Sequence, residues 1–163
     1  MCCGRFFKTH TMLKESPEGN WRICWPIALA LTLAYASSQT VSGPFALLMM
    51  NNRDKIVHFG VFGLLATLLA RLRWVQHRAP LGAYAAVLLV AAFGATDELH
   101  QSFTPGRCCD FYDWLADTLG AATFVVLYVR STAYRTLLEH RLVVRDGERV
   151  MIELPRVPMP RFA

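Results

Sequence analysis

The chain has 163 residues, of which 54% are hydrophobic and 18% charged, and its mean hydropathy is +0.30. Because the apolar residues are concentrated in runs, these values favour a one-domain membrane protein over a soluble one. The net charge of +5 comes from basic residues that flank the runs, which argues against a nucleic-acid partner. Five cysteines without metal-ligand spacing predict no zinc site.

The first apolar run follows a polar, basic leader at residues 1–20 and extends over Ile23–Val41. At 1.5 Å per residue this run would measure about 28 Å, close to the hydrocarbon thickness of a bilayer. An alternative is a cleavable signal peptide, with Ala34-Tyr35-Ala36 as its cleavage site. We favour the uncleaved span, and in both cases the chain emerges on the outer face of the membrane.

Three further runs predict three more spans. Residues 42–53 form either a short interfacial segment or a loop on the bilayer. The spans then cover Asp54–Leu72, Pro80–Thr96 and Asp113–Val129. We therefore expect an all-α membrane protein, a bundle of four transmembrane helices over residues 21–130.

The distribution of basic residues orients this bundle. Eleven lie on one side of the predicted spans and three, Arg53, Lys55 and Arg107, on the other. The positive-inside rule then places both termini in the cytoplasm of a multi-pass protein. Residues 131–163 form a small cytoplasmic tail, in which Ser131–His140 extends the last helix along the membrane surface and Leu142–Ile152 forms a β-hairpin turning at Asp146-Gly147. We assign no chemistry to this tail.

This topology brings polar residues from three segments to the extracytoplasmic face. They are Asp54, Lys55 and His58, then Asp97, Glu98 and Gln101, and finally Arg107, Asp110, Asp113 and Asp117. Asp54 and His58 are four residues apart and share one helix face. Asp110 and Asp113 suit the start of a helix, where they could simply be caps.

Asp97 and Glu98 lie at a helix C-terminus, where acidic groups are unfavourable, so we expect a cationic partner, Lys55 or Arg107. Asp117 stands alone on an apolar helix, which marks it as a functional candidate. Six acids against two bases leave an excess of negative charge that protonation, solvent or a bound divalent cation would relieve. No spacing specifies a metal.

Two motifs resemble the VanZ-like family of bacterial membrane proteins. They are Asp54-Lys55-x-x-His58 and Asp97-Glu98-x-x-Gln101-x-Phe103-x-Pro105-Gly106-Arg107-x-x-Asp110-x-x-Asp113-x-x-Ala116-Asp117-x-x-Gly120. The resemblance covers about residues 54–130, and Asp117 stands where many members have Asn. It implies a protein of the bacterial cytoplasmic membrane. The member that gave the family its name is linked to low-level teicoplanin resistance, and no biochemical mechanism follows from the resemblance.

Three hypotheses follow from the residues and the resemblance. In the first, a cell-envelope membrane protein binds an anionic lipid or a lipid-linked, peptidoglycan-related ligand. The planar guanidinium of Arg107 suits bidentate hydrogen bonds to a phosphate or carboxylate. The residues expected to bind the ligand are Asp54, Lys55, Asp97, Gln101, Arg107, Asp110 and Asp117. In the second, an enzyme acts on a lipid headgroup, with Glu98 or Asp113 as general base and His58 as its partner. In the third, a structural or transport protein uses the polar cluster only to hold its bundle together.

Overall fold

The computed structural model describes residues 20–40, 53–78 and 81–139. These residues form helices and no strand, so the predicted all-α class is confirmed for the described part of the chain. The helices are η1 (Asn20–Ile23), α1 (Cys24–Ser37), α3 (Arg53–Ala70), α4 (Arg73–Arg78), η2 (Gly82–Tyr84), α5 (Ala85–Gln101), α6 (Phe111–Arg130) and α7 (Thr132–Glu139). The leader at 1–19, most of the segment at 42–53 and the predicted hairpin at 142–152 lie outside the described residues.

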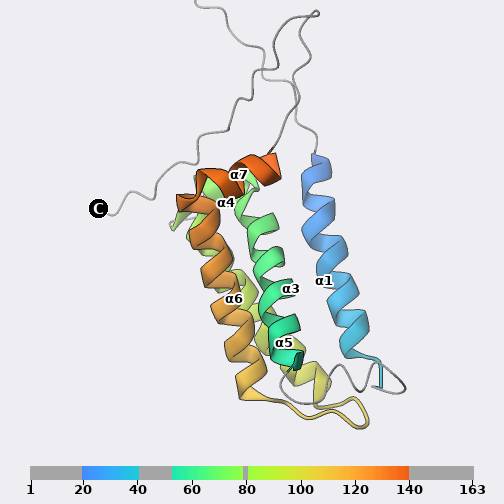
Figure 1. Cartoon of the computed structure of the whole chain (residues 1–163). Coiled ribbons are helices and arrows are strands. Elements are labelled where there is room, and N and C mark those ends of the chain that lie inside the picture. The colour runs from blue at the N-terminus through green and yellow to red at the C-terminus, as the bar shows by residue number, and fades with distance from the viewer. Residues whose placement is uncertain (1–19, 41–52, 79–80, 140–163) are drawn as a thin grey trace, which may run out of the picture.

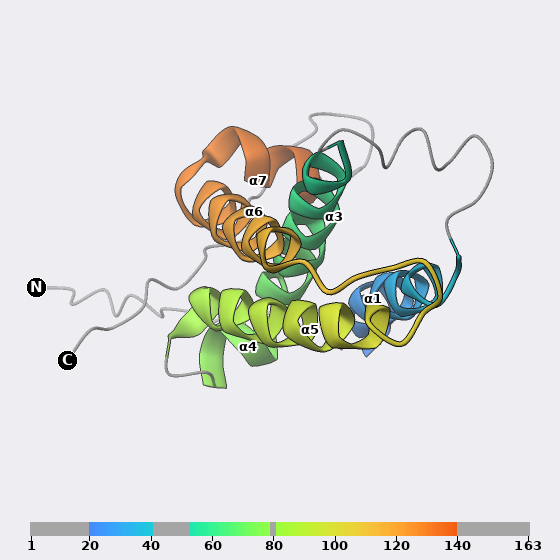
Figure 2. The same ribbon diagram turned by 90° about the horizontal axis from the view of Figure 1, so that it is seen from below.

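Four longer helices, α1, α3, α5 and α6, run lengthwise beside one another, and the short helices α4 and α7 lie at one end (Figure 1). Seen along the bundle, α1 stands to one side, next to α5 and α3 (Figure 2). The opposite end carries the start of α3, the end of α5, the 102–110 loop and the start of α6 (Figure 1). This end collects the polar residues predicted to form a site.

The most extensive contact between the described helices joins α3 to α6. Gly120 makes this contact possible, because a Cβ at this position would overlap the main-chain carbonyl of Phe59. Small residues let helix backbones approach each other closely, and the side chains on either side then pack tightly. Phe62 and Val125 lie in the buried core formed there, and both are at most 1% exposed.

Three of the differences between the helix ends and the predicted segments have a clear local cause. The first helix ends at Ser37 instead of Val41, because the Ser37 hydroxyl bonds across to Asp97 and the next residues turn. The helix predicted to end at Thr96 is α5, which continues to Gln101 and so contains Asp97 and Glu98 in its last turns. The extended backbone of Ser131 ends α6, so α7 is a separate helix instead of an extension of α6.

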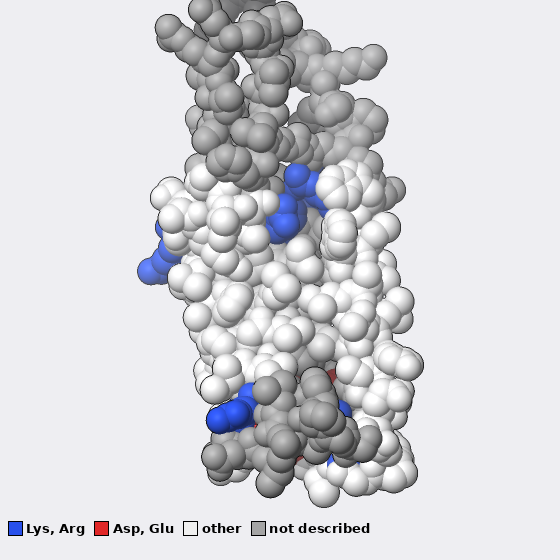
Figure 3. Space-filling view, turned by 45° about the vertical axis from the view of Figure 1, so that its right-hand side comes forward, with Lys and Arg blue, Asp and Glu red and all other residues white. Residues whose placement is uncertain are grey.

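One described helix, Gly82–Gln101, is long and apolar enough to cross a membrane by length and composition. The arrangement of four spans is therefore still a prediction. The surface agrees with contact to an apolar medium, because large side chains such as Leu31, Leu88 and Leu119 are exposed along the helices. On the face drawn in Figure 3, a band without charged residues separates the two ends of the described part.

A glycine pair tests the α3–α6 contact. Gly120→Ala is expected to lower the stability by about 1–3 kcal/mol, because the added methyl group forces the two helices apart. The matched control is Gly60→Ala, whose Cβ would have no neighbour within 4 Å and whose helix propensity improves. Thermal unfolding of the detergent-solubilised protein measures both variants. Equal melting temperatures for the two would contradict this account of the packing.

Candidate functional site

Lys55 ties the first turn of α3 to the first turn of α6. Its Nζ lies 2.8 Å from Asp110 Oδ2 and 2.6 Å from Asp113 Oδ1. Asp110 is also the N-cap of α6, because its Oδ1 accepts a hydrogen bond from the Tyr112 amide at 2.8 Å. The capping role expected for Asp110 is thus present, together with an ion pair that the sequence did not reveal. The hydrogen bond from Lys55, followed by that from Tyr112, holds the pKa of Asp110 below its ordinary value of 3.8.

Asp97 and Glu98 are buried. We expected Lys55 or Arg107 to pair with them, and this is wrong, because neither cation forms an ion pair with them in the described part of the chain. Asp97 accepts hydrogen bonds from the Ser37 hydroxyl at 2.7 and 2.8 Å and from Gln101 Nε2 at 3.0 Å. Glu98 Oε2 accepts from the main-chain amide of Asp110 at 2.9 Å. Neutral donors therefore satisfy these carboxylates, because Lys55 is drawn to the acids of α6 instead.

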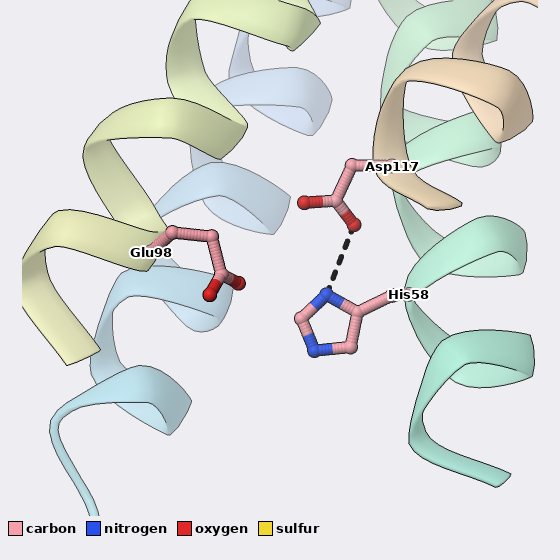
Figure 4. Close-up of side chains that lie close together, drawn as sticks. All are labelled: His58, Glu98 and Asp117. Atoms are coloured by element: carbon pink, nitrogen blue, oxygen red, sulfur yellow. Dashed lines mark hydrogen bonds and ion pairs between the residues drawn. The ribbon is translucent and has the colours of Figure 1, made fainter. Parts of the chain in front are cut away.

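His58, Glu98 and Asp117 meet between α3, α5 and α6 (Figure 4). His58 Nδ1 lies 2.9 Å from Asp117 Oδ1, and one ligand-type atom of each residue lies within 4.8 Å of the others. Asp117 is fully buried, and its Oδ2 has no hydrogen-bond partner among the described residues. Gly94 makes room for this oxygen, since a Cβ there would lie 2.9 Å from it. We call these three residues the His58 cluster.

A partly open cavity of about 140 Å³ lies between α1, α3 and α5, and we call it the α1–α3–α5 cavity. Its lining consists of Leu33, Ala36, Ser37, Val57, His58, Val61, Phe62, Asp97, Gln101 and Arg107. Arg107 donates to Gln101 Oε1 at 3.2 Å and to the Ala36 carbonyl at 3.5 Å, and its buried Nε has no described partner. The cavity thus combines apolar walls with the carboxylate of Asp97 and with the guanidinium of Arg107, which has only neutral acceptors among the described residues.

The other predicted site residues are distributed differently from the sequence expectation. Asp54 does not meet His58 in the described contacts, because its Oδ1 accepts the amide of the following residue, Lys55. Asp113, proposed as a general base, has its carboxylate held by Lys55. Asp110 and Asp54 do not line the α1–α3–α5 cavity.

Sequence reasoning missed the part that the end of α1 plays in the site. The Ser37 hydroxyl donates to Asp97, and the main-chain carbonyl of Ser37 accepts a hydrogen bond from the Thr104 hydroxyl at 3.2 Å. Ser38 Oγ lies 2.9 Å from His100 Nε2. The signal was present, because Ser37-Ser38 interrupts an apolar run just where the first helix ends.

Comparison with models of protein families places the chain in a known family. The family model described as VanZ/LLP1 matches residues 6–134, which is most of the chain and includes every residue of the site. Neither the curated proteins nor the solved structures contain a significant match.

The Lys55 ion pairs predict a pH-dependent stability. Because the folded-state pKa of Asp110 is lowered, its contribution is present above the ordinary value of 3.8 and is lost as the pH falls through the folded value. Lys55→Met removes the ion-pair partner of Asp110 and Asp113. Asp113 is only 8% exposed, so the variant leaves a buried carboxylate without its cation. It should lower the neutral-pH stability by about 1–3 kcal/mol.

Thermal unfolding of wild type and Lys55→Met at several pH values measures this effect. The difference in melting temperature should begin to shrink as the pH falls below the ordinary value of 3.8 and should continue to shrink toward the lower folded-state pKa of Asp110. Arg53→Met, which removes an exposed basic residue from the same helix turn, is the control and should give a small, pH-independent change. A difference for Lys55→Met that stays constant down to acidic pH would contradict the assignment.

Proposed function

Since the chain belongs to the VanZ/LLP1 family, we propose that it is a bacterial cell-envelope membrane protein that binds an anionic lipid headgroup. The ligand class is an anionic lipid or a lipid-linked envelope precursor. The observation that carries this proposal is Arg107, a cation that lines the α1–α3–α5 cavity and has only neutral acceptors among its described contacts.

The surroundings of Arg107 favour an anionic ligand. Taking a guanidinium out of water is costly unless it is paired, and here its Nε is buried without a described partner. A phosphate or carboxylate in the cavity would supply charge-assisted hydrogen bonds to this group. Asp97 also lines the cavity, but both of its oxygens already accept hydrogen bonds from Ser37.

The shape of the cavity favours a lipid over a free anion. Leu33, Val57, Val61 and Phe62 form apolar walls that continue away from the polar end along α1 and α3. A volume of about 140 Å³ is close to the roughly 150 Å³ of a cavity that accommodates benzene. It fits a small headgroup or a short piece of hydrocarbon, so the remaining tail would lie in the bilayer beside α1.

The charge distribution supports an outward-facing location of the site in the membrane. Arg71 and Arg130 lie at the helix ends opposite the site, where the positive-inside rule puts the cytoplasm. The α1–α3–α5 cavity then faces the outer leaflet, within reach of lipids and of lipid-linked envelope precursors. The uncharged band in Figure 3 and the exposed apolar side chains support the placement of the described helices in a bilayer.

A membrane enzyme that acts on a bound headgroup is the second candidate. It is favoured by His58, which lines the α1–α3–α5 cavity while its Nδ1 is held by Asp117, as for an oriented general base. Turnover that is lost in His58→Gln while headgroup binding persists would favour this enzyme over a binding protein.

Arg107→Gln tests the binding proposal. The variant removes the charge and keeps a polar side chain, so it should reduce binding of anionic lipid by roughly tenfold or more. Native mass spectrometry of the protein in mild detergent measures retention of three probes: phosphatidylglycerol, a polyprenyl phosphate and zwitterionic phosphatidylcholine. Preference for the polyprenyl phosphate would indicate a lipid-linked precursor, and preference for phosphatidylglycerol a bulk lipid.

Two controls accompany this experiment. Arg107→Lys keeps the positive charge but cannot make the bidentate hydrogen bonds of a guanidinium, and should retain an intermediate affinity. Arg130→Gln removes an exposed cation at the other end of α6 and should bind as wild type does. Equal retention of anionic and zwitterionic lipids by the wild type would overturn the proposal. In cells, the corresponding readout is a change in teicoplanin susceptibility when the gene is deleted, restored by wild type and not by Arg107→Gln.

A further inference from the structure

We infer that the His58 cluster is a binding site for a divalent cation of the manganese or zinc class. His58 Nδ1, a Glu98 oxygen and an Asp117 oxygen are the proposed ligands (Figure 4). This site is separate from the role proposed for Arg107, because it needs no lipid and involves residues of α3, α5 and α6. The inference rests on the donor set, on an unpartnered buried oxygen and on the fixed orientation of the ligands.

The unpartnered oxygen is the observation that points to a ligand. Asp117 is 0% exposed, and its Oδ2 has no hydrogen-bond partner among the described residues. In Figure 4 this second oxygen points away from His58, toward the helix that carries Glu98. A buried carboxylate oxygen without a donor is costly, and a metal ion would satisfy it.

The charge of the cluster matches a divalent cation. Glu98 is 2% exposed and Asp117 is fully buried, so two carboxylates lie close together away from solvent, beside the imidazole of His58. Lys55 lies on the same helix as His58, but its Nζ donates to Asp110 and Asp113. Two negative charges in such a place need a counter-charge, and one divalent ion supplies it.

The distances fit coordination with a small adjustment. His58 Nδ1 and Asp117 Oδ1 are 2.9 Å apart, and two ligands at right angles around an ion with bonds of about 2.0–2.1 Å are separated by about 2.9 Å. The unpartnered Oδ2 of the same carboxylate would be a second donor to such an ion. Ligands on opposite sides of such an ion lie about 4.2 Å apart, and the cluster spans at most 4.8 Å. The ion would replace the proton now shared by His58 and Asp117, so binding releases that proton.

Neighbouring groups hold the ligands in place, as is usual around metal sites. Glu98 Oε2 accepts from the Asp110 amide at 2.9 Å, and Gln101 Nε2 lies 3.4 Å from Oε1. The His58 ring stacks on Phe62, with centroids 5.7 Å apart and planes at 7°. Gly94 gives Asp117 the space that its carboxylate occupies.

The mixed donor set selects the class of ion. One imidazole nitrogen and two carboxylate oxygens suit Mn²⁺ and Zn²⁺ better than Ca²⁺, which prefers six to eight oxygen ligands. Three protein ligands leave at least one position open for water or for an oxygen of another ligand. The site would therefore be of the open kind that can bind a further molecule.

Binding of Mn²⁺ to the full-length protein in detergent tests the inference. Mn²⁺ is preferred to Zn²⁺ as the probe because exposed thiols such as Cys108 and Cys109 would hold Zn²⁺. The protein is washed with chelator and titrated with Mn²⁺, and the loss of the six-line electron paramagnetic resonance signal of free Mn²⁺ reports binding. We expect about one tight site per chain in the wild type and an increase in its melting temperature.

Two variants and one control decide the outcome. Asp117→Asn and Glu98→Gln keep the side-chain size, and each should weaken Mn²⁺ binding roughly tenfold or more. His77→Gln removes an exposed imidazole from α4, at the opposite end of the bundle, and leaves all three ligands, so it should bind Mn²⁺ as wild type does. If Asp117→Asn fails to fold, as judged by gel filtration and circular dichroism, Glu98→Gln decides alone. No tight Mn²⁺ site in the wild type, or equal binding by a folded ligand variant, would overturn the inference.

Discussion

The close approach of α3 and α6 is the constraint on which the rest of the site depends. Gly120 lets the α6 backbone reach the carbonyl of Phe59, so the residues that flank this contact face each other across a short gap. Toward the polar end of the bundle, His58 meets Asp117, and one turn further on Lys55 meets Asp113. Packing of small residues in the middle of the helices thus determines which polar groups form pairs at their ends.

The first helix is attached in a different way. Along most of its length α1 exposes large apolar side chains such as Trp25, Leu31 and Tyr35. Its polar contacts lie at its C-terminal end, where Ser37 bonds to Asp97 and the Ala36 carbonyl accepts from Arg107. Leu29, Ala30 and Leu33 pack part of α1 against the core, and the α1–α3–α5 cavity lies between the C-terminal half of this helix and its neighbours.

Two proposed sites therefore lie next to each other and share His58. The residue is a member of the His58 cluster and also lines the α1–α3–α5 cavity. The cluster carries negative charge in a buried position, whereas the cavity presents the guanidinium of Arg107. If both sites are occupied, a cation with an open coordination position would lie beside an anionic headgroup, an arrangement that serves binding and chemistry equally well.

The sequence by itself determined the helical class, the approximate positions of the long helices, the family and the end of the bundle at which the polar residues meet. These features follow from apolar runs, from charges at their ends and from a motif, all of which can be recognised within one segment. Only the tertiary structure decided the partners: His58 bonds to Asp117 instead of Asp54, and Asp97 bonds to Ser37 instead of a cation. The reason is physical, because helical periodicity specifies which residues share a face, whereas the rotation of one helix against another is determined by close packing such as that of Gly120 on Phe59.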